Sequence, residues 1–264
     1  MIRGIVLAPW VASAVAAMAF AFVPAAHAQN RPRPDRGDWD VVVGTYLWAS
    51  GLDGQVGIGD NVVDVDIGFS DVIDHLDGAL FLPIEMRKGR WGAVIELMAL
   101  RLSGQRGTPG PLFDAAELDV DQTLIEISPR YWLVRRGPLA VDALAGIRLW
   151  HLSSTLTLDP GPAAGLPDVP LGLGEQWVDP ILGARAVADL GGRWLVHGRG
   201  DLGGFGVGSD FTWQLIGLLG YRLSSSTTLR AGYRQLDVDF EDEDDGFLYD
   251  VGTGGWIIGV TIRL

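Results

Sequence analysis

Residues 256–264, WIIGVTIRL, end the sequence with side chains of alternating character. Apolar groups occupy every second position from Trp256 onward, and Gly259, Thr261 and Arg263 stand between them. Neighbouring side chains of a β-strand point to opposite faces, so this spacing predicts a strand with one apolar and one polar face. From Trp39 onward similar runs recur, and no long stretch has apolar residues at helical spacing. The chain beyond Trp39 is therefore expected to be all-β.

The connections between these runs are of two lengths. Short turns that alternate with long loops are typical of an outer-membrane barrel, whose periplasmic turns are short and whose extracellular loops are long. The pattern therefore predicts a single antiparallel transmembrane β-barrel in the cell outer membrane. The tight connections span residues 88–90, 135–138, 190–193 and 224–226, and the longer ones span 103–116, 153–174 and 241–246.

Composition excludes several functional classes. The 264 residues include 33 Asp and Glu against 20 Lys and Arg, a formal net charge of -13. A protein that binds nucleic acid needs a basic surface, so no nucleic-acid partner is expected. The absence of cysteine removes disulfides, thiol nucleophiles and cysteine metal ligands, and four histidines leave little for a transition-metal site. We expect no cofactor and no metal centre.

The N-terminus has the pattern of a secretory signal. Arg3 precedes an apolar run over residues 4–23, and a small-residue cleavage pattern ends at Ala28. The alternative, a permanent membrane helix, is disfavoured because the run is barely long enough to span a bilayer and contains Pro9. The expected division is residues 1–28 as a signal peptide, 29–38 as a periplasmic linker and 39–264 as the barrel.

Aromatic side chains cluster near both ends of the expected strands. Amphipathic rings at both membrane interfaces form the two girdles of a transmembrane barrel. The alternative is that these rings are core residues of a soluble sheet. The residues near the tight turns are Trp91, Trp132, Trp194 and Tyr221, and those near the opposite strand ends are Trp48, Trp150, Trp213 and Trp256.

The two faces of the expected strands differ in charge. If the apolar face contacts lipid, Leu80, Leu82 and Ile84 point outward and Glu85 points into the lumen. An Arg facing lipid near the midplane costs about 2–4 kcal/mol, so a spanning chain must sort its charges this way. The near balance of signs favours pairing over a selective pore. Together with His197, the expected lumen charge network is Glu85, Arg87, Glu96, Glu126, Arg130, Asp142, Arg148, Asp179, Arg185, Arg199, Asp201, Arg230 and Arg234.

The number of strands depends on one hairpin. Both ends of the domain should be periplasmic, so the number of crossings should be even. Residues 52–69 contain a turn signal at Gly59, and twelve strands result if this hairpin enters the wall, ten if it stays above the membrane. We narrowly favour twelve. The other crossings are expected near residues 39–49, 79–88, 90–102, 117–134, 138–152, 175–190, 193–204, 210–223, 227–240 and 247–264.

Alternation breaks in two places. The apolar positions change parity near Gln122 and again near Gln235. A β-bulge at each point would restore the pattern, or the distal parts of these strands extend beyond the membrane and escape the lipid constraint.

The least strand-like segment spans residues 69–80. Ser70 could cap a short helix that begins at Asp71 and presents Val72, Ile73 and Leu76 on one side, as a plug or as a packed extracellular turn. Acidic side chains are frequent over residues 64–77 and 241–245, where oxygen ligands could hold a hard cation. A solvated acidic loop is the favoured interpretation of both clusters, because neither matches a known calcium loop.

Four stretches of the sequence carry a family resemblance: residues 46–54 (YLWASGLDG), 63–80 (VDVDIGFSDVIDHLDGAL), 206–215 (GVGSDFTWQL) and 229–240 (LRAGYRQLDVDF). They resemble a family of Gram-negative outer-membrane β-barrels within the porin-like and OmpA-like membrane barrel superfamily. The resemblance implies the barrel fold and the outer membrane, and it brings no activity and no catalytic residues. Such barrels commonly end in phenylalanine, the terminal aromatic of the assembly signal, whereas this chain ends in Leu264.

The sequence predicts a non-enzymatic outer-membrane barrel, either structural or a narrow passive channel for small solutes. One alternative is a lipid-modifying hydrolase, because His151 and Ser153 resemble the His-x-Ser pair of outer-membrane lipid A deacylases, although the rest of that signature is missing. Another is an adhesion or interaction barrel that uses residues 103–116 and 153–174 as display loops. Expected partners are outer-membrane lipid and lipopolysaccharide, the barrel-assembly machinery and small solutes.

Overall fold

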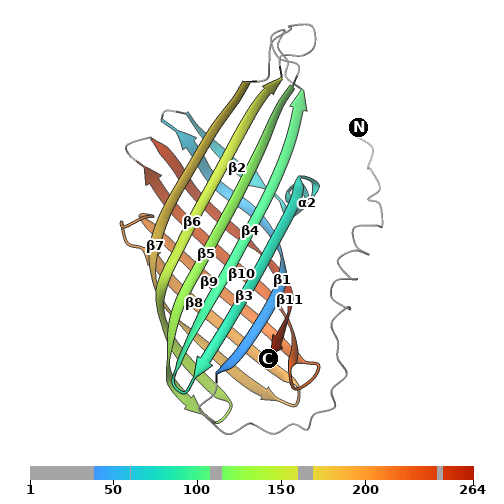
Figure 1. Cartoon of the computed structure of the whole chain (residues 1–264), viewed down its shortest axis with the longest axis vertical. Coiled ribbons are helices and arrows are strands. Elements are labelled where there is room, and N and C mark those ends of the chain that lie inside the picture. Colours follow the sequence, from blue (N-terminus) through green and yellow to red (C-terminus); the bar gives the residue numbers. More distant parts are fainter. Residues whose placement is uncertain (1–38, 60, 108–114, 160–168, 243–245) are drawn as a thin grey trace. The chain divides into compact units, whose positions relative to one another are not determined.

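The computed structural model describes residues 39–59, 61–107, 115–159, 169–242 and 246–264, which form a closed antiparallel β-barrel (Figure 1). The expected signal peptide and linker, residues 1–38, lie outside the described residues. The elements are β1 (Asp40–Ile58), β2 (Asn61–Ile67), α2 (Phe69–Asp74), β3 (Leu76–Lys88), β4 (Trp91–Gly107), β5 (Ala115–Arg136), β6 (Leu139–Asp159), β7 (Val169–Gly191), β8 (Trp194–Gly204), β9 (Phe211–Arg222), β10 (Thr227–Asp242) and β11 (Phe247–Arg263).

The predicted barrel is confirmed, and it closes with ten strands. From β3 to β11 each strand pairs with the next, and β11 returns to β1 in a register that runs from Val42↔Arg263 to Ile58↔Phe247. The narrowly favoured count of twelve is not observed. The reason is that β1 continues without a break through residue 52, and β2, seven residues long, pairs with its upper half as a hairpin arm. The arm is shorter than the roughly 9–11 residues of a spanning strand.

The tight connections lie where the sequence places them. Gly89 and Gly137 have φ values of 61° and 58°, a left-handed conformation that glycine adopts without steric cost and that lets the strands reverse within a few residues. Arg263 and Asp40 lie at this same end, joined by an ion pair. Both ends of the barrel sequence therefore lie on the side of the tight turns.

Strand lengths differ around the barrel. β4 to β7 have 17, 22, 21 and 23 residues, whereas β8 and β9 have 11 and 12, and in Figure 1 the long strands rise above the rest. Much of what the sequence indicated as loop is therefore strand, because residues 103–107, 115–116, 153–159 and 169–174 continue the ladders. Residues 108–114 and 160–168 of these predicted loops lie outside the described residues.

The outer face carries an apolar band, here called the outer belt. Side chains in this band are large and exposed, and two rows of outward aromatic residues lie at its edges. Trp91 contacts Tyr131 and Trp194 contacts Tyr221 on the turn side, and Tyr233 contacts Trp256 on the other. The girdle prediction is wrong for Trp48, Trp132 and Trp150, whose rings point into the lumen. Members of the outer belt are Leu47, Leu80, Ile125, Ile127, Ile147, Val178, Leu182, Val196, Leu202, Leu215, Leu219 and Ile258.

Beyond the belt the two faces exchange character. On β10, Leu236, Val238 and Phe240 are buried inside the barrel, while Asp239 points outward. An exposed ion pair between Arg101 and Asp121 lies on the outside of β4 and β5 at a comparable height. The strands therefore continue past the apolar band with a polar exterior and an apolar interior.

The two parity changes in the sequence have this origin. The ladder of β4 with β5 crosses Gln122 without a register shift, and the ladders of β10 cross Gln235 likewise. Of the two alternatives, the structure therefore has the strands that extend past the apolar band and not the bulges. Apolar side chains beyond these points fill the lumen, and no bulge is needed to turn them toward lipid.

The segment near residue 70 contains the predicted short helix. α2 begins after Gly68, without a side-chain cap, so Ser70 is inside the helix and does not cap it. Val72 is buried and Ile73 exposed, and α2 packs beside β1 at the edge of the barrel (Figure 1). No helix in the described residues is long and apolar enough to cross a membrane.

Close approach of β9 and β10 yields a test of the fold. A Cβ added at Gly232 would overlap the carbonyl oxygen of Gly217, whereas a Cβ at Gly217 meets nothing within 4 Å. We expect Gly232→Ala to lower the free energy of unfolding by about 1–3 kcal/mol, the usual cost of overpacking, and Gly217→Ala to leave it nearly unchanged. Urea unfolding of the refolded barrel measures both, and equal stability of the two variants would contradict the close approach.

Candidate functional site

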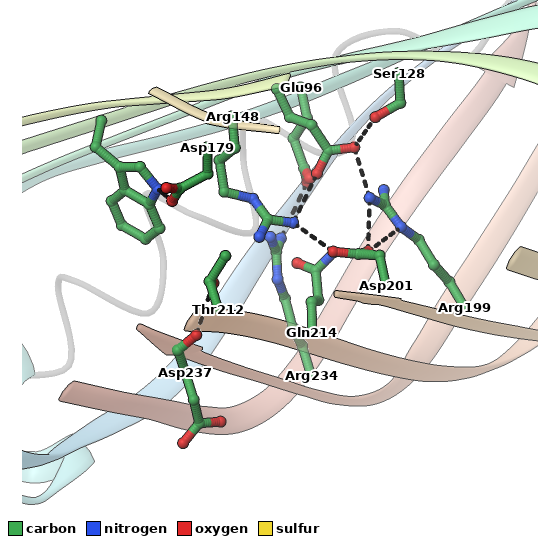
Figure 2. A network of polar contacts seen from close by, with 12 residues as sticks. Glu96, Ser128, Arg148, Asp179, Arg199, Asp201, Thr212, Gln214, Arg234 and Asp237 are labelled. Carbon is green, nitrogen blue, oxygen red and sulfur yellow. Dashed lines mark hydrogen bonds and ion pairs between the residues drawn. The ribbon is translucent and has the colours of Figure 1, made fainter. Parts of the chain in front are cut away.

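Charged and polar side chains cross the lumen at mid-height in what we call the central layer: Tyr46, Glu96, Glu126, Arg148, Arg199, Asp201, Gln214 and Arg234. Alternation along the strands brings them together, because each occupies an inward position of its strand. Arg148 Nη2 lies 3.1 Å from Glu126 Oε2 and 2.8 Å from Asp201 Oδ1. Arg199 bridges the same two carboxylates from the other side, at 2.6 Å from Glu126 Oε1 and 2.9 Å, through Nε, from Asp201 Oδ2 (Figure 2).

Several of these bonds join strands that are not neighbours. Arg148 on β6 reaches Asp201 on β8, and Arg199 on β8 reaches Glu126 on β5. Arg234 on β10 donates to Glu96 on β4 at 3.2 Å and to the hydroxyl of Tyr46 at 2.7 Å, and that hydroxyl donates to Glu96 at 2.6 Å. The bonds of the central layer therefore cross the lumen between non-adjacent strands.

Burial makes this pairing obligatory. The side chains of Arg148 and Glu126 are 0% exposed, and the side chains of Arg199 and Asp201 are 5% and 0% exposed. A charge removed from water is tolerated only when it is paired and its remaining hydrogen-bonding groups are satisfied. Ser128 donates to Glu126 and Gln214 donates to Asp201, which supplies part of that requirement.

A second set of charges lies nearer the tight turns. Glu85 forms ion pairs with Arg130, Arg185 and Arg230, and Arg185 also forms an ion pair with Asp142. Glu85 and these three arginines border a cavity of about 280 Å³ that opens toward the turns and is rich in arginine. At the rim Arg87 pairs with Asp40. The ring nitrogens of His197 are buried, and neither has a hydrogen-bond partner among the described residues.

Asp179 has a different environment from the other acids. Its carboxylate accepts hydrogen bonds from Trp150 Nε1 at 2.9 Å and from the backbone N–H and hydroxyl of Ser209 at 2.7 and 2.9 Å. Ser209 in turn accepts a bond from Trp177 Nε1 at 2.9 Å. Asp179 thus anchors the β8–β9 connection inside the barrel and joins the charges to the aromatic residues above.

Above the charges the lumen is apolar. Trp177 stacks on Trp150 at a centroid distance of 5.4 Å and on Phe240 at 4.1 Å. The predicted lumen charge network therefore covers only the lower part of the lumen, because the polarity of the strands inverts above it. This apolar layer consists of Phe81, Met98, Leu124, Trp150, Trp177, Leu236, Val238, Phe240, Phe247, Tyr249 and Val251.

All thirteen charges expected in the lumen occupy inward positions. Glu85, Arg87 and Arg230 are partly exposed to the cavity, and the others are buried. Sequence reasoning missed Tyr46 and Gln214, which are uncharged but share the parity of the charges around them. Both lie within stretches that carry the family resemblance, and that combination is the signal that could have identified them.

The described residues around His151 and Ser153 do not have the geometry of a hydrolase active site. His151 and Ser153 lie on the outward face of β6, opposite Thr123 and Asp121 of β5. Among the described residues no hydrogen bond joins His151 to Ser153 or to a carboxylate, and Asp121 accepts a bond from Arg101 at 2.6 Å. A nucleophilic serine needs a base within hydrogen-bond reach, and that base needs an orienting group.

Where the structure describes them, the acidic stretches do not form a metal-binding cluster. Asp64 accepts a hydrogen bond from Gln55, and Asp71 lies in α2. Within the described ranges, no three His, Asp or Glu side chains gather closely enough to hold a metal ion. Residues 243–245 of the second stretch lie outside those ranges.

No protein-family model matches the sequence, and no curated protein does. Among solved structures, the translocator domain of the autotransporter NalP from Neisseria meningitidis matches with a TM-score of 0.42 and 11% identity, over 87% of this chain and 90% of that one. Ail of Yersinia pestis, solved with the heparin analogue sucrose octasulfate, matches with a TM-score of 0.40 and 10% identity, over 86% of this chain and 98% of that one. The Pseudomonas putida toluene transporter TodX matches with a TM-score of 0.30 and 10% identity, over 85% of this chain and 88% of that one. Similarity at this level says nothing of what this chain binds.

Removal of one central charge should be costly. Arg148→Met leaves Glu126 and Asp201 with half of their positive partners, and breaking a buried pair costs about 3–5 kcal/mol. As the control, Arg222→Met breaks an exposed pair with Asp189 that is worth at most about 1 kcal/mol. Urea unfolding should separate the two variants clearly, and a loss below 1 kcal/mol for Arg148→Met would show that the central layer is hydrated.

Proposed function

We propose that the chain is a non-enzymatic integral protein of the Gram-negative outer membrane, with a lumen closed to ions and solutes. The observation that carries the proposal is the central layer, in which arginines and carboxylates bridge non-adjacent strands and are almost wholly buried. A passive channel keeps its lining groups hydrated, because ions must enter and leave. Paired side chains at mid-height favour the structural interpretation over the narrow channel.

The outer belt supports the membrane location. Its side chains are large, apolar and exposed, as a surface in contact with acyl chains should be, and aromatic pairs lie along both edges. In this location the turns face the periplasm and residues 1–28 act as a cleaved signal peptide. Surrounding lipid and lipopolysaccharide are then its immediate partners, and the barrel-assembly machinery inserts it.

A display role for the long strands is the second candidate. β5, β6 and β7 each exceed 20 residues, about twice the length needed to span, so they project beyond the belt on one side. Their polar outer surface would be accessible to an extracellular partner. The closed lumen is compatible with this role, because display requires a rigid base and no pore.

Contact of the outer belt with lipid can be tested by placing a charged side chain in it. Leu182 is 60% exposed near the middle of the belt on β7, and Gln176 lies on the same outward face six residues away, beyond the apolar band. In vesicles we expect Leu182→Arg to cost about 2–4 kcal/mol of unfolding free energy and Gln176→Arg about 0–1 kcal/mol. Equal costs at the two depths would contradict insertion in a bilayer.

Closure can be tested by conductance in a planar bilayer. The refolded chain should show no discrete current steps. The double variant Arg148→Ala, Arg199→Ala leaves Glu126 and Asp201 without ion-pair partners, so water and cations should enter and cation-selective steps should appear. Arg222→Ala, outside the central layer, should stay silent. Reproducible steps from the unaltered chain would overturn the proposal.

A further inference from the structure

The barrel wall has an interruption between β1 and β3. These strands pair over only four residues, from Asp40↔Arg87 to Val43↔Ile84. Farther along, β1 changes partner and pairs with β2 from Leu52 onward. Residues 44–51 of β1 therefore have no ladder partner on this side, over a length of roughly 27 Å at 3.4 Å per residue. We call this part of the wall, between residues 44–51 and 76–83, the seam.

A proline lies where the ladder stops. Continuing the register would place Pro83 opposite Gly44, and Pro83 has no backbone N–H to donate. The ladder of β3 with β4 continues through Pro83↔Glu96 without a shift, so the interruption affects the β1 side alone. At Pro129, by contrast, the pairing of β5 with β6 is lost locally and resumes at Arg130↔Leu144.

Side chains, not backbone bonds, join the two edges of the seam. Phe81 of β3 stacks on Tyr46 of β1 at a centroid distance of 5.0 Å and meets Trp48 edge-on at 6.4 Å. The guanidinium of Arg234, in the central layer, lies over the ring of Trp48 at 4.9 Å from its centroid. The seam therefore ends on the turn side at the central layer.

A cavity of about 280 Å³ passes through the seam. It is bordered by outward residues of the belt, Leu47 and Ile258, and also by Met98 and Leu124 of the apolar layer inside the lumen. α2 contributes Val72 at its upper margin. None of the described residues that border it is charged. An apolar cavity of about 150 Å³ is already large enough to take up a molecule of the size of benzene.

We propose that the seam is a lateral binding site, in which one hydrocarbon chain of a surrounding lipid enters from the bilayer and lies against the apolar layer of the lumen. The proposal rests on the membrane location proposed above. The outer opening of the seam lies within the outer belt, at Leu47 and Ile258. The molecules that contact this opening are therefore acyl chains. Inside, the central layer blocks passage toward the turns. The chain can therefore enter the upper lumen but cannot cross to the other end.

The test is photolabelling from within the bilayer. The full chain is reconstituted in phosphatidylcholine vesicles that contain a phosphatidylcholine with a diazirine midway along one acyl chain, and labelled residues are mapped by mass spectrometry. We expect label on Leu182, which faces lipid, and also on Phe81 and Met98, which face the lumen. Label on Leu182 without label on Phe81 or Met98 would overturn the proposal. No label on Leu182 would instead overturn the membrane location itself.

Blocking the seam identifies the route. Ala79 borders the cavity, so Ala79→Trp should reduce labelling of Phe81 and Met98 at least fivefold, while Ala184→Trp on the outward face of β7 should not. Because the chain has no cysteine, Ala49→Cys can be folded first and then modified with a bulky thiol reagent, with Ala184→Cys as control. Undiminished luminal labelling after modification at position 49 would overturn entry through the seam.

Discussion

The structure depends on one constraint: a charge held inside the barrel, away from water, must find its partner there. Arg148, Arg199 and Arg234 reach across the lumen to carboxylates on strands that are not their neighbours. Each such bond fixes the distance between two non-adjacent strands of the wall. A shift of any strand by one residue would turn its charge outward and leave the partner unpaired, so the central layer specifies register as well as closure.

Sequence periodicity was sufficient for the barrel, the positions of its tight turns and the inward position of every charge in the lumen network. It failed where the lipid outside the barrel and the apolar layer inside it both require an apolar residue at every second position. Leu236 and Phe240 alternate as lipid-facing residues do, yet they face inward because β10 has left the belt. Trp150 and Trp132 were predicted at strand ends, as girdle residues are, but both lie on the inner face, and Trp150 is in the middle of β6. Alternation of apolar and polar side chains shows that a strand has two different faces. Which face points into the barrel depends on the strands beside it.

The seam illustrates a different limit. A proline in a spanning strand was visible in the sequence, and its inability to donate a hydrogen bond is a local property. Its consequence was not local, because Pro129 interrupts one ladder briefly and Pro83 ends another. The two prolines differ in the strands beside them, since past Pro83 the partner of β1 becomes β2, and residues 52–58 are already occupied. The hairpin that made the strand count ambiguous thus pairs with the upper half of β1, and the barrel closes between β1 and β3 through four residue pairs only.

The pairing of β1 also changes how the barrel is connected. β1 joins β11 along almost its whole length, and the N–H of Leu264 donates to the carbonyl of Val41, whereas β1 joins β3 over four residues. In space the sheet is a ribbon that starts at β3, runs to β11 and ends with β1. A circular permutant that began at β3 and fused residue 264 to residue 40 would restore agreement between chain order and ribbon order. β1 therefore has its longest pairing with the last strand of the barrel and its shortest with β3, the next wall strand along the chain.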